Sequence, residues 1–397
     1  MHRDFHRHHR FFCDKEMNEM YLSVFLMNLA ESMISIFVPI YLFTLNYSIV
    51  SILLFFLIGH LGNVLFSLPV AKMVSKIGSK HAILISTPFL IVYYFGLQFL
   101  PQFPWFFAIL PLGIAFRALF YNFGFDLNFI DHLDRKKIGR ELSSLSFFSI
   151  LATIFSPLMA GLIIFYFGFQ TIFLVGSVIL LVSCLPLFLS EDHRSKINFT
   201  WKSIWKMLFL RRNMGMVLSF TGYAIESSIG RSIWPIFLFV VLGTAQKVGY
   251  AASVSIFLTV FTIFATGKLA DRFNPKKLLS FGTMLYFFGW VGCLFADSVT
   301  KIFFFNSYKG ISERFLQLPW SSIFYKIINP ETYFQMVVAR DLIFNASRLL
   351  ILPIIMVIFY INFYPFVISF AVAAAFTLLY PLLNNSFKSE DLEYLKN

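Results

Sequence analysis

The sequence has few charged residues and few cysteines. Asp, Glu, Lys and Arg make up 13% of the 397 residues, whereas hydrophobic residues make up 58% and Phe alone occupies 54 positions. A soluble domain needs a largely polar surface around its core, so this composition excludes an ordinary water-soluble fold. The three cysteines, Cys13, Cys184 and Cys293, lie far apart and offer neither a disulfide framework nor the spacing of a metal site.

The sequence also lacks the motifs of ATP-driven and catalytic proteins. It contains no G-x-x-x-x-G-K-[ST] phosphate loop, no nucleophile motif and no metal-ligand cluster. We therefore expect no enzyme and no cofactor, and any transport has to be driven by an ion gradient or by the solute's own gradient. The histidines of residues 1–19 are most simply part of a disordered basic tail, with a metal-binding arm as the alternative.

Long apolar runs are what the chain has in abundance. A membrane-spanning helix needs about 20 apolar residues, and twelve such runs are present. They occupy residues 20–45, 48–73, 81–100, 104–130, 142–167, 169–190, 214–242, 246–270, 276–297, 301–328, 332–361 and 363–385. The sequence therefore predicts an all-α polytopic membrane protein with twelve transmembrane helices.

The basic residues are distributed unevenly between the two sides of these spans. The net charge of +12 is concentrated in the tails and in alternate loops, while the other loops carry only Lys247 and Lys301. Because positively charged loops remain in the cytoplasm, this pattern places both termini there, and it explains the basic excess without nucleic-acid binding. We expect a monomer that crosses the plasma or cytoplasmic membrane many times.

One hydrophilic segment, residues 267–277, reads G-K-L-A-D-R-F-N-P-K-K. It resembles the signature loop of the Major Facilitator Superfamily, G-x-L-A-D-[RK]-x-G-[RK]-[RK]. The matching residues are Gly267, Leu269, Ala270, Asp271, Arg272, Lys276 and Lys277, and Asn274-Pro275 replaces the second Gly. A degenerate copy at 71–81, A-K-M-V-S-K-I-G-S-K-H, keeps Lys76, Gly78 and Lys80 but has Ser75 in place of the motif acid.

Two further pairs of segments repeat at nearly the same spacing as these loops. E-S…P-I-Y-L-F at 31–43 returns as E-S…P-I-F-L-F at 226–239, and G-I-A-F-R at 113–117 returns as G-I-S-E-R at 310–314. The repeats indicate an internal duplication, and the resemblance implies two six-helix bundles related by pseudo-twofold symmetry. The expected parts are a tail (1–19), an N-terminal bundle (20–190), a basic cytoplasmic linker with an amphipathic helix (191–213), a C-terminal bundle (214–385) and a tail (386–397).

The resemblance also implies a gate at the loop acid. In the superfamily the end of the eighth helix lies near the start of the fifth, so we expect Asp271 to bind that helix N-terminus or Arg140 and to tie the halves together. The R-E-L at 140–142 recurs as R-D-L at 340–342. Because Ser75 carries no charge, the mirrored contact has to differ.

Ionisable residues within the predicted spans are the candidate site. A charge at membrane depth costs about 2.5–3.5 kcal/mol on insertion scales, so it faces protein or water. Most of these residues fall in the first, fourth, seventh and tenth spans, which line the central cavity in the superfamily. The candidates for substrate binding and coupling are Glu31, Arg117, Tyr121, Glu226, Arg231, Lys309, Glu313 and Arg314.

The roles expected of these residues follow from their positions. Glu31 is the first choice as proton carrier and Glu226 the second, with Arg117 as the cation for Glu31, and Arg117 and Arg314 orienting the solute. Purely structural ion pairing between helices is the alternative for each of them, and Lys309 and Glu313 can neutralise each other within one helix. His60 is either a proton relay or, more simply, a hydrogen-bonded packing residue.

Together these features predict a secondary active transporter that moves a small organic solute by alternating access, coupled to protons. The positive sum of the intramembrane charges favours an anionic or zwitterionic solute, and the many aromatic residues leave an amphipathic, drug-like solute as the alternative. A transporter-like receptor or scaffold remains a second class. A polytopic lipid-modifying enzyme is a weaker third, since the outer loops are short.

Overall fold

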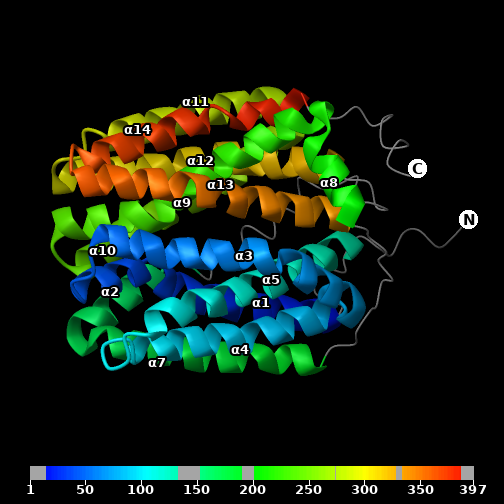
Figure 1. Ribbon diagram of the computed structural model, residues 1–397. Coiled ribbons are helices and arrows are strands. Elements are labelled where there is room, and N and C mark those ends of the chain that lie inside the picture. The colour runs from blue at the N-terminus through cyan, green and yellow to red at the C-terminus, as the bar shows by residue number, and fades with distance from the viewer. Residues whose placement is uncertain (1–14, 133–152, 190–200, 273, 328–332, 386–397) are drawn as a thin grey trace, which may run out of the picture.

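The computed structural model describes residues 15–132, 153–189, 201–272, 274–327 and 333–385, and every element in these ranges is a helix. The helices form two layers along one axis (Figure 1). The first layer contains α1 (Lys15–Ser35), α2 (Phe37–Thr44), α3 (Ile49–Ile77), α4 (Ser79–Gln98), α5 (Phe106–His132) and α7 (Ser156–Leu189). The second contains α9 (Met214–Leu242), α10 (Ala245–Arg272), α11 (Pro275–Cys293), α12 (Val299–Ile327), α13 (Tyr333–Ile361), α14 (Pro365–Thr377) and the 3₁₀ helix η3 (Tyr380–Asn385).

Most helices lie within the predicted spans, and in the described part of the chain eight segments are long and apolar enough to cross a membrane. The all-α, twelve-helix architecture is confirmed. Residues 142–152 of the fifth predicted span lie outside the described residues. The fifth and sixth spans share α7, whose backbone leaves the helical conformation at Gly168, with φ +81°. That residue lies at the predicted boundary between the two spans.

Proline accounts for the breaks in the first and last spans. The N–H of residue 39 would donate to the carbonyl of Ser35 in a continuous helix, but Pro39 has none, and α1 ends at Ser35. In the same way Pro381 cannot donate to the carbonyl of Thr377, where α14 ends and η3 follows.

The two copies of the signature loop reverse the chain by different means. Gly78 lies between α3 and α4 with φ +89°, a conformation that favours glycine. In the second copy Asn274 caps α11, accepting a hydrogen bond from the N–H of Lys276 at 3.0 Å, and Pro275 is the first residue of the helix. The replacement of the motif glycine by Asn-Pro therefore preserves a sharp entry into the next helix.

The linker between the layers contains the helix α8 (Trp201–Phe209) and a 3₁₀ turn, η2 (Arg211–Asn213). α8 packs against α13, burying Ile204 and Met207, while Trp205 and Phe209 are exposed. The helix expected in this linker is thus present, with apolar side chains on both faces. We call the end of the molecule at which α8 lies the linker end (Figure 1).

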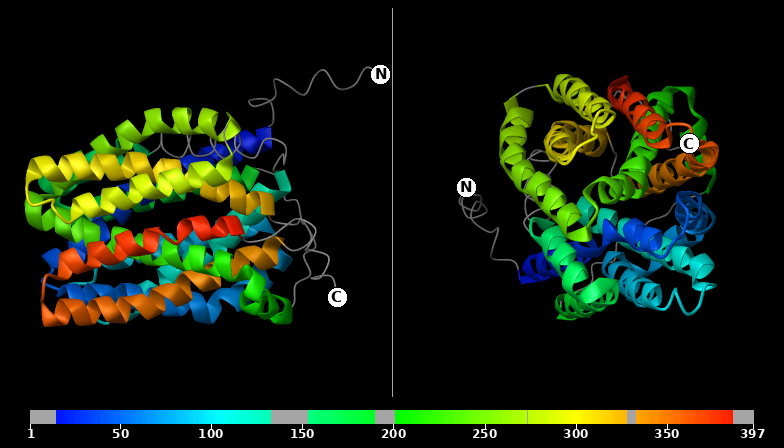
Figure 2. Two further views of the ribbon diagram at one scale, coloured as in Figure 1. Left: turned by 90° about the horizontal axis from the view of Figure 1, so that it is seen from above. Right: turned by 90° about the vertical axis from the view of Figure 1, so that its left-hand side faces the viewer.

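The same packing pattern occurs in both layers. α5 packs against α3 and α4, and α12 packs in the same way against α10 and α11. The layers meet along α3 with α13 and along α7 with α10, and the view along the axis shows the two groups of helices side by side (Figure 2). A cavity between two such layers is bounded by residues from both halves of the chain.

Candidate functional site

A cavity of about 380 Å³ lies between the two layers. Its walls come from α1, α3, α4 and α5 of the first half and from α9 and α13 of the second. Of the eight candidate residues, Glu31, Arg117, Tyr121 and Arg231 line it, together with Asp341, Asn345 and Arg348 of α13. The structure therefore brings charged groups from both halves into one polar space.

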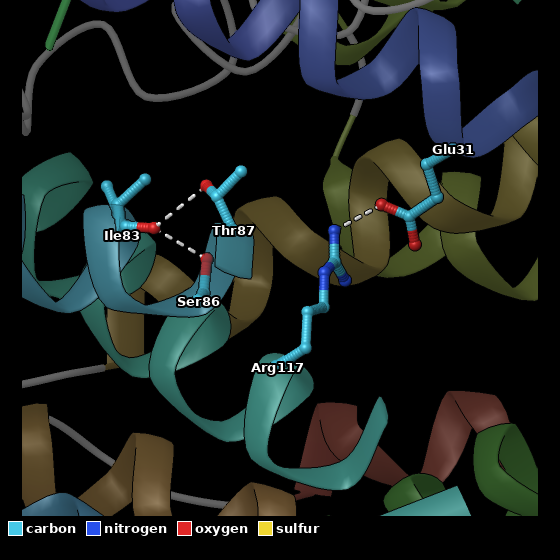
Figure 3. Close-up of polar contacts among 5 residues, drawn as sticks. All are labelled: Glu31, Ile83, Ser86, Thr87 and Arg117. Carbon is cyan, nitrogen blue, oxygen red and sulfur yellow. Dashed lines mark hydrogen bonds and ion pairs between the residues drawn. The ribbon is translucent and has the colours of Figure 1, made fainter. Parts of the chain in front are cut away.

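The first-half wall is centred on an ion pair. Arg117 of α5 donates through Nη2 to Oε2 of Glu31 of α1 (Figure 3). Its guanidinium carbon lies 4.5 Å from the ring centroid of Tyr121. The nearby hydroxyls of Ser86 and Thr87 donate to the carbonyl of Ile83 within α4 (Figure 3). The pairing of Arg117 with Glu31 suggested by the sequence is present, and the Nε of Arg117 is buried with no hydrogen-bond partner in the described part of the chain.

The second-half wall carries two arginines. Arg231 of α9 donates from Nη2 to the hydroxyl of Tyr223 at 3.1 Å. Arg348 of α13 donates to the Ala224 carbonyl at 3.4 Å and to Oγ of Ser227 at 3.1 Å. Within the described parts of the chain, neither arginine forms an ion pair.

Asp341, Asn345 and Arg348 share the cavity-facing side of α13, as their spacing predicts. Asn345 donates from Nδ2 to Asp341 Oδ2 at 3.2 Å, and its Oδ1 lies 2.9 Å from Nδ1 of His60 on α3. His60 thus hydrogen-bonds across the interface between the halves, and it also lines the cavity.

Three residues join the halves on the linker-end side of the cavity. Asp126, one turn beyond the cavity residue Asn122 on α5, accepts a hydrogen bond from the hydroxyl of Tyr325 on α12 at 2.9 Å. Its other oxygen accepts from Nη2 of Arg340 on α13 at 2.5 Å. We call Asp126, Tyr325 and Arg340 the clamp. Because a buried guanidinium–carboxylate pair depends on both partners, the clamp fastens the first half to the second at this level.

Glu226, the predicted counterpart of Glu31, lies outside the cavity lining and inside the second half. Its Oε1 accepts from the Tyr286 hydroxyl at 2.6 Å and from Trp290 Nε1 at 3.1 Å, and its Oε2 accepts from the Tyr380 hydroxyl at 3.0 Å. Lys309 is near the same group, with Nζ 3.9 Å from the ring centroid of Trp290. These contacts join α9, α11, α12 and η3 around one carboxylate.

The other candidates of the tenth predicted span also lie outside the lining. Lys309 lies between two indole rings, with Nζ 4.3 Å from the Trp234 centroid. Glu313 accepts from Gln317 Nε2 at 2.6 Å, and Arg314 donates to the same amide at 3.5 Å. In the described part of the chain Lys309 and Glu313 form no ion pair with each other.

The predicted gate residues are only partly described. Arg140 lies outside the described residues, and Gly267, Asp271 and Arg272 are described only as backbone of α10. Ser75 donates within α3 to the carbonyl of Lys72 at 2.9 Å. Lys276 donates from Nζ to the Asn384 carbonyl at 2.8 Å, which ties the start of α11 to η3, and Lys277 is exposed.

The sequence reasoning overlooked the clamp, although two signals for it were present. Asp126 is an acid inside the predicted span 104–130, and Arg340 belongs to the R-D-L that repeats the R-E-L of the earlier loop. Both positions are near the ends of predicted spans, where a charge is easily assigned to a loop. Tyr325 carries no such signal, since tyrosine is common in membrane helices.

The profile of the Major Facilitator Superfamily matches residues 21–242, more than half of the chain. The chain belongs to this superfamily. It is accordingly a multi-pass integral membrane protein of a transporter family. No curated protein matches the sequence.

Solved superfamily structures share the fold. A mutant of the nucleoside transporter NupG is similar with a TM-score of 0.69 and 12% sequence identity, over 94% of this chain and 100% of that one. FucP, described as a superfamily transporter in the outward conformation, has a TM-score of 0.68 and 13% identity over the same shares of the two chains. The TM-scores show that the fold is shared. Because the sequence identities are this low, the solute has to be argued from the cavity of this chain.

Proposed function

We propose that this superfamily member is a secondary active transporter that moves a small organic solute by alternating access, coupled to protons. The observation that carries the proposal is the polar cavity, which is built jointly by the two halves. Transporters formed from two repeats bind solute at the repeat interface and expose it to either side as the halves rock. The volume of about 380 Å³ lies within the usual range of small-molecule sites.

In this proposal the clamp holds the cavity closed on the side of the linker end. It lies between the cavity and the linker end and links α5 to α12 and α13. We assign the linker end to the cytoplasm, because the basic residues of α8 and of both signature loops lie there. Opening the cavity to the cytoplasm then requires breaking the Asp126–Arg340 pair, and both groups become hydrated as it opens.

Glu31 is the proposed proton carrier. It is half-exposed within the cavity wall and its partner is Arg117. The other charged or titratable groups around it are Tyr94 of α4, Tyr121 of α5 and Arg231 of α9. Protonation of Glu31 removes the charge that neutralises Arg117, so the proton and the solute become linked through this one pair.

Purified protein in liposomes provides the test of this function. Each metabolite that raises the unfolding temperature of the protein is supplied as a labelled probe, with and without an inward proton gradient. Wild-type protein is expected to accumulate a probe only with the gradient. Glu31→Gln should lose accumulation and keep exchange of the same probe, while Asp297→Asn, an exposed carboxylate paired with Lys301, should behave as wild type.

Two results would overturn the proposal. Accumulation by Glu31→Gln in response to the proton gradient would remove Glu31 as carrier. Binding of probes without uptake or exchange by the wild-type protein would instead indicate a receptor with a transporter fold.

A further inference from the structure

The two arginines of the second-half wall differ from the arginine of the first. Arg117 is neutralised by Glu31, whereas the partners of Arg231 and Arg348 are hydroxyl and carbonyl oxygens. In the described ranges no carboxylate pairs with either of them. Both guanidinium groups line the cavity, Arg231 as an exposed side chain and Arg348 as a buried one.

Such an arrangement leaves two guanidinium groups without a carboxylate in direct contact, and Glu31 and Asp341 act on them only from a longer range. A guanidinium remains charged in proteins, and burying one without an anion carries a desolvation cost. Arg231 and Arg348 also lie close enough for their charges to repel. An anion between the two arginines would offset the desolvation cost and reduce the repulsion between their charges. A carboxylate matches the planar fork of a guanidinium.

The acids of the cavity limit how much negative charge a solute can bring. The lining contains three arginines and two acids, Glu31 and Asp341, so the sum leaves one positive charge. Glu31 already pairs with Arg117, and Asp341 already accepts from Asn345. A solute with one negative charge makes the net charge of the lining and solute zero. A second negative charge on the solute would be repelled by the carboxylates of Glu31 and Asp341.

The part of the lining that comes from the first half also includes an aromatic wall. Phe55 and Phe56 of α3 and Tyr93 of α4 line it, and the ring centroids of Phe55 and Tyr93 are 6.4 Å apart. Asn63 adds a buried Oδ1 that has no hydrogen-bond partner among the described residues. This wall can accommodate an apolar ring or chain, together with a single hydrogen-bond donor.

We propose that the solute is an organic monoanion whose carboxylate bridges Arg231 and Arg348 while its apolar body contacts the Phe55, Phe56 and Tyr93 wall. The inference rests on the proposed function for the place of binding and adds the chemical class of the solute. Arg231 and Arg348 are then the residues that select the head group, and Asn63 contributes to selection of the body.

A binding experiment on the purified full-length protein tests the class without requiring transport. The probes are benzoate, benzamide, benzylamine and phenyl phosphate at constant ionic strength, and the readout is the thermal unfolding midpoint as a function of probe concentration. Benzoate is expected to raise the midpoint saturably, and benzamide and benzylamine are not. Arg231→Gln and Arg348→Gln should weaken benzoate binding by about tenfold or more, whereas Arg211→Gln, an exposed arginine on η2, should not.

Arg231→Lys and Arg348→Lys keep the positive charge, and they serve as controls in case the Gln variants do not fold. They should bind benzoate with intermediate affinity, because lysine lacks the planar fork. Equal binding of benzoate and benzylamine, or benzoate binding unchanged in both Gln variants, would overturn the inference. Binding of phenyl phosphate but not benzoate would overturn the carboxylate assignment in favour of a phosphate head group.

The outcomes also separate this inference from the proposed function. Proton-driven accumulation of neutral probes only would leave the transporter intact and reject the anion site. Benzoate binding that depends on both arginines, in a protein that moves no probe, would support the anion site and reject transport.

Discussion

At the scale of single residues, the two carboxylates at matching positions of the repeat have different surroundings. Glu31 faces the cavity and pairs with an arginine, whereas Glu226 accepts hydrogen bonds from two tyrosines and one tryptophan. Hydrogen bonds to a charged group contribute about 1.5–3 kcal/mol each. We therefore expect Glu226 to stabilise the second half, and we keep Glu31 as the proposed proton carrier.

Glu226→Gln should lower the thermal unfolding midpoint and leave proton-driven accumulation in place. An amide oxygen is a weaker acceptor, and its NH₂ group faces donors, so the variant should lose about 1–3 kcal/mol. Glu313→Gln is the matched control, since Glu313 is half-buried and its contact is one amide donor. Loss of accumulation in a Glu226→Gln protein with a wild-type midpoint would transfer the carrier role to Glu226.

This difference could not have been read from the sequence. The E-S…P-I-[YF]-L-F repeat places both acids at the same depth, but the groups around Glu226 come from α11 and η3, far along the chain. Arg117 was predictable as the partner of Glu31 because both lie inside spans that the repeat identifies. Which side of a helix faces the cavity depends on its rotation against its neighbours, and weakly amphipathic membrane helices do not encode that rotation clearly.

At the scale of elements, two of the contacts between the halves differ in kind. The clamp joins α5 to α12 and α13 through charge, whereas α7 and α10 touch almost backbone to backbone. At this crossing a Cβ on Gly249 would lie 2.4 Å from the carbonyl oxygen of Pro157, and the N–H of Leu158 donates to Oγ of Ser253 at 3.0 Å. The ionic contact can be hydrated and broken, while the close crossing depends on shape.

Asp126→Asn should shift the protein toward a state open at the linker end. The change leaves Arg340 without its counterion in the closed state, and removing one partner of a buried pair typically costs about 3–5 kcal/mol. In a protein whose native cysteines are replaced by serine, Asn122→Cys should then react faster with an impermeant maleimide in inside-out vesicles. Tyr325→Phe removes a neutral donor and should have a smaller effect. An unchanged rate in Asp126→Asn would show that the clamp does not gate the cavity.

Gly249→Ala should weaken the α7–α10 crossing. The added methyl group meets a backbone carbonyl and cannot be accommodated by side-chain rotation, so we expect a loss of about 1–3 kcal/mol and slower exchange. Gly113→Ala on α5 is the control, because a Cβ there meets nothing within 4 Å. A midpoint for Gly249→Ala equal to that of the control would mean that the two helices are free to move apart.

At the scale of the whole molecule, the fold was the most predictable property. The lengths of the apolar runs, the repeat spacing and the signature loop all indicate two six-helix bundles, and Gly168 lies at a predicted span boundary. The break before Pro39 inside the first span was not predicted, because proline alone does not mark a break: α3, α4, α5, α9, α12 and α13 each continue through one. The cavity was only partly predictable. Its charged residues come from α1, α5 and α9, as expected. Those of α13 were added by the structure, and α12, the tenth predicted span, contributes none to the lining.

The orientation of the molecule is open to a direct test. Gln102, in the connection between α4 and α5, is expected outside the cell, and Lys206 of α8 inside. In intact cells an impermeant maleimide should modify Gln102→Cys and spare Lys206→Cys, and both should react once the cells are opened. Modification of Lys206→Cys alone in intact cells would reverse the topology.

The indole rings around Lys309 have a spectroscopic consequence. Of the six tryptophans, Trp234, Trp290 and Trp320 are buried in the second half, Trp201 and Trp205 belong to α8, and Trp105 is exposed at the far end of the first half. Trp234 is three residues from Arg231, and Trp290 donates to Glu226. Intrinsic fluorescence excited at the indole band therefore comes from the second half and from α8, which packs against α13, with Trp105 as the contribution of the first half. A ligand that binds Arg231 is expected to change the emission of Trp234, while rearrangements of the first half away from Trp105 should leave the emission spectrum unchanged.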